Sequence, residues 1–218
     1  MIYTIPPVQN FAVKMSALKE ALSRPLPAEA AQRRMAPTPR PGALSIERVE
    51  QCKQAAVLIL LYPKDEIPHL IFIQRSMESV HHPGQIAFPG GRIEDGESNN
   101  EAALRECEEE VGCDREQLQL LGKLTPLYIP PSGFCVHPFV SFLSERPEWR
   151  RQQEEVAEVL EVPVHDLLMP SAQKATCEHR EAVWMRIPYY DWQGHRIWGA
   201  TAMMLCEFLT VYASIDLK

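Results

Sequence analysis

The spacing of apolar residues changes several times along the chain, which predicts an alternation of helices and strands. Residues 8–23 place Phe11, Met15, Leu18 and Leu22 at helical intervals, so we expect a helix there. The prolines between residues 25 and 41 then predict an irregular connector, because proline interrupts both helices and strands. We expect this N-terminal helix and proline-rich linker, residues 1–45, to be an addition to a single domain spanning residues 46–218.

Short apolar runs bounded by turn residues predict most of the remaining elements. Strands are expected at residues 54–62, 69–75, 117–124, 136–143 and 155–162. Residues 163–169 should form a short helical turn, residues 182–189 and 195–198 a hairpin, and residues 199–214 a closing helix. This succession predicts a mixed α/β (α+β) fold.

The stretch from residue 88 to residue 113 predicts a loop that leads directly into a helix. Ser98 and Glu101 have the spacing of a capping box at the start of a helix. Gly112 is a natural stop, so about fourteen residues between the two signals should be helical.

One face of this predicted helix collects negative charge. At about 100° per residue, Glu106, Glu109 and Glu110 share a face, with the small Ala102 and Ala103 beside them. The face that we expect to be buried carries Leu104, Cys107 and Val111. Like charges at these spacings destabilise an isolated helix by about 0.2 to 0.5 kcal/mol per pair. A divalent cation such as Mg²⁺ or Mn²⁺ would reverse that penalty, whereas the alternative is an ordinary solvated acidic face.

The overall charge limits the kinds of partner. A net charge of −7, from 29 acidic and 22 basic residues, argues against a protein that coats nucleic acid through a broad positive surface. A small phosphorylated substrate is compatible with this charge if a metal ion supplies positive charge locally. No run approaches the roughly 18 apolar residues of a membrane span, and the first residues lack a secretory signal. We therefore expect a cytoplasmic protein without membrane contact.

The cysteines show no spacing typical of a structural site. Six are scattered without a C-x-x-C pair: Cys52, Cys107, Cys113, Cys135, Cys177 and Cys206. Neither a zinc site nor a disulfide framework is indicated, so we expect reduced thiols.

The loop and helix together are similar to the Nudix box, G-x5-E-x7-R-E-U-x-E-E-x-G-U. All fixed positions match: Gly91, Glu97, Arg105, Glu106, Glu109, Glu110 and Gly112. The two U positions, usually bulky and aliphatic, are Cys107 and Cys113, and a free cysteine packs as a small hydrophobe. The resemblance implies the Nudix fold, a mixed β-sheet sandwiched between α-helices. It also implies an enzyme that hydrolyses phosphorus-containing anhydrides.

A second motif, just upstream, resembles the coenzyme A pyrophosphatase subgroup of Nudix hydrolases. Its form is L-L-T-x-R-S-x3-R-x3-G-x3-F-P-G-G, and these positions are in register here: Arg75, Ser76, Gly84, Phe88, Pro89, Gly90 and Gly91. Residues 71–73 replace Leu-Leu-Thr only loosely, and Val80 stands where the second arginine is expected. An arginine there would suit a substrate phosphate. His81 or His82 could take that role, or both could be ordinary loop histidines.

The glutamate face supplies the expected metal ligands. Glu106 and Glu110 lie one turn apart and are the expected direct ligands of Mg²⁺ or Mn²⁺. Glu109 is expected as a further ligand or as a contact through water, and the Gly91 carbonyl could complete the shell. By the family pattern, Arg105 orients Glu109 or Glu97, although a plain ion pair on the helix surface explains it equally well.

The remaining candidates concern the proton transfer and the substrate. The general base is either Glu109 or Glu155, and Glu97 is expected to support the loop. The expected substrate contacts are Arg75, Arg92, Gly90 and His82, with ordinary surface pairing as the alternative for the arginines. Exposed strand charges are the expectation for Glu154, Glu158 and Glu161.

The subgroup resemblance implies a particular reaction. Water would attack one phosphorus of the pyrophosphate in coenzyme A, giving 3′,5′-ADP and 4′-phosphopantetheine. Val80 keeps a second interpretation open, a Nudix hydrolase of another nucleoside diphosphate derivative such as ADP-ribose, NADH or a dinucleotide. A third is a Nudix module that binds a nucleotide without cleaving it, although an intact box argues against that. Family analogy also suggests a homodimer.

Overall fold

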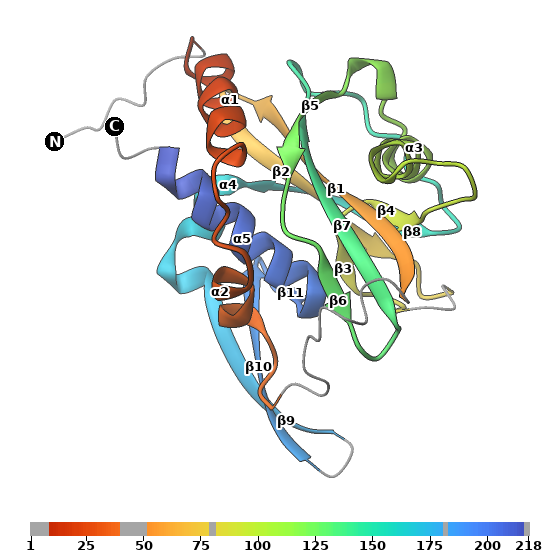
Figure 1. The fold of residues 1–218 in the computed structure, drawn as a ribbon, viewed down its shortest axis with the longest axis vertical. Coiled ribbons are helices and arrows are strands. Elements are labelled where there is room, and N and C mark those ends of the chain that lie inside the picture. Colours follow the sequence, from red (N-terminus) through yellow and green to blue (C-terminus); the bar gives the residue numbers. More distant parts are fainter. Residues whose placement is uncertain (1–8, 40–51, 79–81, 181–182, 216–218) are drawn as a thin grey trace, which may run out of the picture.

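The computed structural model describes residues 9–39, 52–78, 82–180 and 183–215, so Val80 and His81 lie outside the described residues. A mixed sheet of eight strands has helix α3 (Asn99–Val111) on one face and helix α5 (Gly199–Ile215) on the other (Figure 1). Helix α1 (Gln9–Leu22) packs on the α5 side. The predicted mixed sheet between helices is confirmed.

The sheet is organised around a parallel pair of strands, β1 (Lys53–Lys64) and β7 (Phe134–Phe142). Strand β1 also pairs antiparallel with β2 (Ile67–Arg75) and with β4 (Gly90–Arg92). The other strands of this sheet are β3 (Ile86–Ala87), β5 (Gln119–Lys123), β6 (Leu127–Ile129) and β8 (Val156–Pro163). The end of β2, the whole of β4 and the start of β8 thereby meet beside α3, where a cleft lies.

Strand β1 is buried on both faces, which explains its nearly continuous apolar sequence. Leu58 and Leu60 pack against α3, whereas Ile59 and Leu61 belong to the core on the α5 side. Burying a side chain of this size stabilises the fold by about 1.5 to 3 kcal/mol. The two cores therefore fix the position of α3 relative to the sheet.

The predicted strands correspond to β1, β2, β5, β7 and β8, and the closing helix corresponds to α5. The helical turn at residues 163–169 is α4 (Val164–Leu168). The sequence pattern does not predict several short elements, among them α2 (Ala28–Gln32), which lies within the proline-rich connector. Within the described ranges, no helix combines the length and the apolar character that crossing a bilayer requires.

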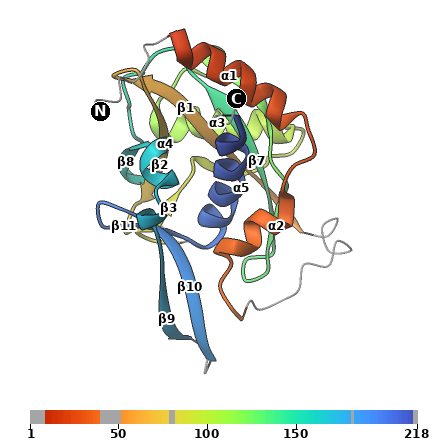
Figure 2. The same cartoon turned by 90° about the vertical axis from the view of Figure 1, so that its left-hand side faces the viewer.

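A separate three-stranded sheet projects from the body of the molecule (Figure 2). It consists of β9 (Gln173–Arg180), β10 (Val183–Trp192) and β11 (His195–Trp198). The predicted hairpin between β10 and β11 is confirmed, and its turn residues Gln193 and Gly194 both have positive φ. The sequence pattern does not predict strand β9, because its mostly polar sequence lacks the apolar alternation of a half-buried strand.

The expectation that all cysteines are reduced is wrong for one pair. Cys52 and Cys135 form a disulfide, with Cα atoms 5.7 Å apart. The parallel pairing of β1 with β7 places Gln54 opposite Cys135 and so brings the two cysteines together. A separation of 83 residues hides this proximity in the sequence. Four other cysteines are free: Cys107, Cys113, Cys177 and Cys206.

The contact between β4 and β1 leaves no room for a side chain at Gly90. Its φ is +155°, and an added Cβ would lie 2.4 Å from the carbonyl oxygen of Ala56. We expect Gly90→Ala to lower the free energy of unfolding by about 2 to 4 kcal/mol, measured by urea denaturation. Gly96→Ala is the matched control, since Gly96 also has a positive φ of +85° but no atom within 4 Å of an added Cβ. Its expected loss is about 1 kcal/mol; equal losses in the two variants would contradict the close approach.

Candidate active site

Helix α3 begins and ends at the residues that the sequence predicts. The Ser98 backbone N–H donates a hydrogen bond to Glu101 Oε2 at 2.9 Å, and both halves of the capping box are present. Gly112 ends the helix in the left-handed conformation, with φ of 72°, and its N–H donates to the Glu108 carbonyl. Caps at both ends fix the helical register and hence the direction of every glutamate on α3.

The glutamates of α3 do not share one equally exposed face. Glu110 is only 1% exposed, whereas the Glu109 side chain is 54% exposed. Ala102 and Ala103, expected beside the carboxylates, are instead fully buried, and Leu104 is only partly buried. The two alanines let α3 approach the sheet closely, and this approach turns Glu110 inward.

Glu110 has one satisfied and one unsatisfied oxygen. Its Oε2 accepts a hydrogen bond from the Gly90 N–H at 2.9 Å. Its Oε1 is buried without a hydrogen-bond partner among the described residues, and Arg75 Nη1 lies 3.8 Å away, within ion-pair range only. Burial, helped by the nearby charge of Glu106, raises the pKa of Glu110 to about 8. An unsatisfied buried polar group costs about 1 to 3 kcal/mol, so this oxygen is available for a ligand.

Glu106 lies directly against the glycine turn. A Cβ added to Gly91 would come 2.3 Å from Glu106 Oε1, so any residue larger than glycine would displace this carboxylate. Burial raises the pKa of Glu106, while Arg105 Nη1 donates a hydrogen bond to Glu106 Oε1 at 2.9 Å. The carboxylates of Glu106 and Glu110 therefore approach the same glycine pair from α3.

Arg105 ties the loop before α3 to the helix. It donates two hydrogen bonds to the Glu97 carboxylate, at 2.8 and 3.0 Å, and one to the Arg92 carbonyl at 3.2 Å. It also donates to Glu109 Oε2 at 3.0 Å. The hydrogen bonds from Arg105 lower the pKa of Glu97, which also accepts the Glu94 N–H. Arg105 thus makes both kinds of contact expected of it, one that orients Glu97 and one that pairs with Glu109 on the helix surface.

A cleft of about 500 Å³ opens beside these side chains. Three residues expected to contact substrate line it, namely Arg75, Arg92 and Gly90, as does the candidate base Glu155. His82 is exposed and does not belong to the described residues that line the cleft. The cleft thus brings together residues from β2, β4, α3 and the loop that ends just before β8.

Two further residues that line the cleft belong to neither sequence motif. Glu94 belongs to the loop before α3, and Gln152 to the loop between β7 and β8. The Gln152 N–H donates to the Glu110 carbonyl at 3.0 Å. Only the fold brings this loop to the end of α3, so sequence spacing gives no signal for Gln152.

The donor set suits a hard divalent cation. The unpartnered Glu110 oxygen and the Glu106 carboxylate over Gly91 are oxygen donors of the type that Mg²⁺ and Mn²⁺ prefer. Across the described ranges, no three acidic, histidine or cysteine side chains converge into a closed metal site, and Glu109 is hydrogen-bonded to Arg105. Mg²⁺ usually binds through one or two carboxylates together with water and substrate phosphates. Two carboxylates at an open cleft therefore fit such an ion.

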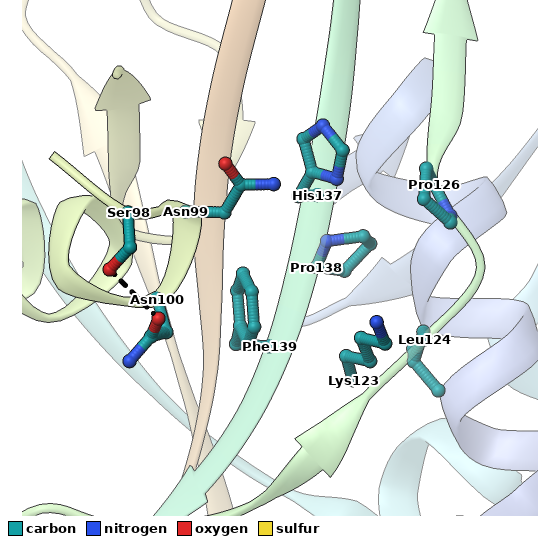
Figure 3. A pocket seen from close by; sticks show the side chains of 9 residues that line it. All are labelled: Ser98, Asn99, Asn100, Lys123, Leu124, Pro126, His137, Pro138 and Phe139. Carbon is teal, nitrogen blue, oxygen red and sulfur yellow. Dashed lines mark hydrogen bonds between the residues drawn. The ribbon is translucent and has the colours of Figure 1, made fainter. Parts of the chain in front are cut away.

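A second cavity, of about 380 Å³, lies at the N-terminal end of α3. Figure 3 shows Asn99 from α3, His137 and Phe139 from β7, and Lys123 from the end of β5 around it. Burial and the charge of Lys123 lower the pKa of His137, whose Nε2 lies 2.6 Å from Gln54 Oε1. None of the residues that line this cavity lines the cleft, so it lies outside the candidate active site.

Glu161, expected as an exposed charge, is instead the centre of a hydrogen-bond network. It accepts bonds from Tyr62 Oη at 2.6 Å, Lys64 Nζ at 2.9 Å, Arg146 Nε at 2.7 Å and Trp149 Nε1 at 3.0 Å. Burial raises the pKa of Glu161, but the hydrogen bonds outweigh it and hold that pKa below its usual range. The other two acids are exposed, as expected: Glu154 and Glu158.

Comparison with known proteins decides the family. Residues 53–186 match the family model described as the NUDIX domain. The chain belongs to the Nudix family. A relative from Yersinia pestis, named "Uncharacterized Nudix hydrolase NudL", is 37% identical over 155 residues, which cover 70% of this chain and 76% of the relative. A protein of the same name from Yersinia pseudotuberculosis matches equally well, at 37% over 155 residues.

Two solved structures are similar at lower identity. The MutT protein from Methanosarcina mazei Go1 is 15% identical with a TM-score of 0.48, and the match covers 76% of this chain and 96% of that protein. The Nudix domain of NrtR from Shewanella oneidensis, solved with ADP ribose, is 18% identical with a TM-score of 0.45. That match covers 58% of this chain and 82% of the NrtR domain. Similarity at this level carries no statement about substrate.

Family membership gives the general activity. The chain is a Nudix hydrolase of nucleoside diphosphate derivatives, and such pyrophosphohydrolases cleave phosphorus-containing anhydrides. The predicted Nudix fold is confirmed by the same comparison. Nudix hydrolases in general use divalent ions such as Mg²⁺ or Mn²⁺, and the carboxylates described above fit an ion of this class.

The buried carboxyl of Glu110 predicts a pH dependence. Its pKa of about 8 lies above the ordinary value of 4.5, so the folded protein holds a proton that the unfolded chain releases. This contribution to stability is present below the ordinary value and is lost as the pH rises through about 8. A cation needs the carboxylate form, so we expect Mg²⁺ to raise the melting temperature more at about pH 9 than at about pH 6.

Glu110→Gln is the comparison variant for that measurement. Without a titrating group at this position, its metal-free melting temperature should fall less than that of the natural protein over the same pH range. Parallel curves for the two proteins in EDTA would show that the Glu110 pKa is not raised.

Proposed function

We propose that this Nudix hydrolase cleaves the pyrophosphate of coenzyme A or its derivatives, giving 3′,5′-ADP and 4′-phosphopantetheine. The observation that carries the proposal is that both ends of the upstream motif reach the cleft. Arg75, near the start of that motif, and Gly90, at its end, line the cleft together with Glu106 and Glu110. The motif typical of the subgroup is therefore next to the Nudix box in space as well as in sequence.

The residues of the Nudix box would hold the cation. We assign Mg²⁺ or Mn²⁺ to Glu106, Glu110 and the Gly91 carbonyl, with Glu109 as a further ligand or a contact through water. When bound, the ion supplies Lewis-acid polarisation of the phosphoryl oxygens and neutralises their charge. Arg105 keeps the Glu106 carboxylate in place through its hydrogen bond of 2.9 Å.

The arginines of the cleft would bind the phosphates. Arg75 and Arg92 both line the cleft, and a guanidinium group can donate two parallel hydrogen bonds to a phosphate. Gly90 lines the cleft and would contact the substrate through its backbone, because β1 fills the space that a side chain would need. Arg75 also lies near Glu110, with its Nη1 3.8 Å from Glu110 Oε1. A phosphate bound by Arg75 would therefore lie close to the proposed metal ligand Glu110.

We assign the general base to Glu155 in preference to Glu109. Glu109 Oε2 already accepts a hydrogen bond from Arg105 at 3.0 Å, which occupies that oxygen. Glu155 is exposed in the cleft, and its charge helps to raise the pKa values of Glu106 and Glu110, so it lies near both. In this role, the Glu155 carboxylate takes the proton of the attacking water.

A second candidate is a Nudix hydrolase of another nucleoside diphosphate derivative, such as ADP-ribose or NADH. It would use the same glutamates and differ in the group that binds the rest of the substrate. The observation that favours it is Val80, which stands where the coenzyme A motif has its second arginine. A contact from His82 to the substrate stays a prediction in both cases.

We also propose residues 46–218 as the catalytic domain and residues 1–45 as an addition, of which helices α1 and α2 pack on that domain. Phe11 and Met15 of α1 are buried in the core that includes α5. Gln32 of α2 donates a hydrogen bond at 2.8 Å to Glu207 of α5, which is fully buried. The addition thus contributes to the core on the face of the sheet away from the cleft.

The substrate and the metal ligands are tested together by product analysis. The protein is incubated with Mg²⁺ or Mn²⁺ and coenzyme A, an acyl-coenzyme A, ADP-ribose or NADH, and the products are separated by chromatography. We expect 3′,5′-ADP and 4′-phosphopantetheine from coenzyme A at a higher kcat/KM than any other cleavage. Glu106→Gln and Glu110→Gln should each lower turnover by at least about a hundredfold, because each removes a metal ligand. Glu154→Gln, an exposed control, should leave it unchanged.

Two results would overturn parts of this proposal separately. Faster cleavage of ADP-ribose or NADH than of coenzyme A would reject coenzyme A as the preferred substrate but leave the proposed pyrophosphate hydrolysis intact. Normal turnover in both Glu106→Gln and Glu110→Gln would reject the metal ligands.

The choice of base is tested by the pH dependence of kcat. In Glu155→Gln we expect kcat to fall by about a hundredfold or more and the acidic limb of the profile to disappear, because no carboxylate there takes up the proton. Glu109→Gln should lower kcat less and keep that limb. The opposite pattern would assign the base to Glu109.

A further inference from the structure

The loop between β7 and β8, residues 143–155, wraps around the C-terminal end of α3. The Arg150 N–H donates to the Val111 carbonyl at 2.9 Å, and the Gln152 N–H donates to the Glu110 carbonyl at 3.0 Å. Carbonyls in the last turn of a helix have no partner within the helix, so this loop supplies two of the missing donors. It therefore holds the end of the helix that carries Glu106 and Glu110.

The same loop brings two residues into the cleft. Gln152 and Glu155 both line it, and the Glu155 carbonyl accepts a hydrogen bond from the Ser76 N–H at 2.7 Å. Gln152 closes the turn before β8, since its carbonyl accepts the Val156 N–H at 2.9 Å. Any shift of the loop would thus move Glu155 relative to the glutamates of α3.

The first half of the loop is anchored to the sheet by one carboxylate. Glu161 of β8 accepts two hydrogen bonds from the Arg146 guanidinium, at 2.7 and 2.9 Å, and one from Trp149 Nε1 at 3.0 Å. From the sheet, Tyr62 and Lys64 of β1 donate to the same carboxylate. The rings of Tyr62 and Trp149 also meet edge to face, 5.2 Å apart. Glu161 thus joins two strands to the loop.

The geometry of this network resists small displacements. An arginine that donates two bonds to a carboxylate fixes direction as well as distance, and Glu161 is largely buried, with 14% of its side chain exposed. Trp149 follows Arg146 by three residues and directly precedes Arg150, whose N–H caps α3. The anchor and the cap therefore lie on adjacent residues of one short segment.

We propose that Glu161 is a positioning residue for hydrolysis, which holds the β7–β8 loop so that it caps α3 and presents Glu155 to the cleft. Glu161 does not line the cleft and acts through Arg146 and Trp149. The catalytic half of this inference rests on the proposed role of Glu155. The structural half, that Glu161 restrains the loop against α3, is independent of any substrate.

The test compares Glu161→Gln with Glu158→Gln. Both residues belong to β8 and both changes remove one negative charge, but Glu158 is exposed and lies outside this network. Arg146→Ala breaks the same hydrogen bonds from the loop side. The Arg146 side chain is 43% exposed, so this variant should still fold if Glu161→Gln does not. Arg146→Lys retains a donor to Glu161 and serves as the conservative variant.

Hydrogen exchange measures the restraint of the loop. In Glu161→Gln and Arg146→Ala, the amides of Arg150 and Gln152 should exchange at least about tenfold faster than in the natural protein, because capping bonds open when the loop is loosened. The amides in the middle of α3 should keep their rates, and so should every amide in Glu158→Gln. Unchanged exchange at Arg150 and Gln152 in both anchor variants would overturn the proposal, whatever the substrate proves to be.

Kinetics separates positioning from stability. The rates are measured at a temperature where each variant is fully folded. We expect kcat to fall by about tenfold or more in Glu161→Gln and Arg146→Ala, because a small misplacement of a reacting group is enough to slow a reaction. KM should change by less than about twofold. Arg146→Lys should recover most of the loss. A normal kcat in folded Glu161→Gln and Arg146→Ala would reduce Glu161 to a stabilising residue and reject the inference. Absence of turnover in the natural protein would count against the proposed function, while the exchange measurement would still decide the loop.

Discussion

The proposed active site depends on two carboxylates that helix α3 holds against a glycine turn. Caps at both ends fix the register of this helix. Glu110 is almost fully buried with one oxygen unpartnered, and Glu106 lies so close to Gly91 that a Cβ would collide with it. Burial disfavours the charged form of both carboxyls, and the nearby charge of Glu106 adds to that cost for Glu110. In the proposed site, a divalent cation would turn both penalties into attraction, so the features that weaken the metal-free protein would serve to bind the metal.

The rest of the fold keeps this arrangement in place. Both cores pack on β1, which fixes α3 on one face of the sheet and β4 at its edge. Arg105 joins the loop to the helix through Glu97, and the β7–β8 loop closes the far end of the helix. None of these contacts uses the side-chain carboxylate of Glu106 or Glu110. The position of the proposed metal ligands is therefore supported by charged and capping contacts as well as by the hydrophobic cores.

Some of the site could be predicted from the sequence because its signals are local. The capping box and Gly112 mark the ends of α3 within the helix itself, and the spacing of the glutamates follows from helical geometry. The burial of Glu110 could not be predicted, because it depends on how closely Ala102 and Ala103 let the helix approach β1. Helical spacing places Glu106 and Glu110 one turn apart but says nothing about which of them the sheet covers.

Contacts between distant segments account for the other differences. Glu161 has the sequence context of a surface charge, and only the pairing of β8 with β2 and the course of the β7–β8 loop bring Arg146, Trp149 and Tyr62 to it. The Cys52–Cys135 disulfide likewise follows from the parallel pairing of β1 with β7. Local patterns thus predicted the helix that carries the proposed metal ligands, and tertiary packing decided how its side chains are oriented.

The central claim is that Glu106 and Glu110 hold a divalent cation beside Gly91. Anomalous X-ray diffraction from crystals soaked in Mn²⁺ tests it most directly, because manganese scatters anomalously and the protein atoms hardly do at its absorption edge. We predict an anomalous peak within coordination distance of carboxylate oxygens from both glutamates, at about 2.0 to 2.2 Å, and its loss in Glu110→Gln crystals. A peak elsewhere in the molecule, or an equal peak in Glu110→Gln, would contradict this account.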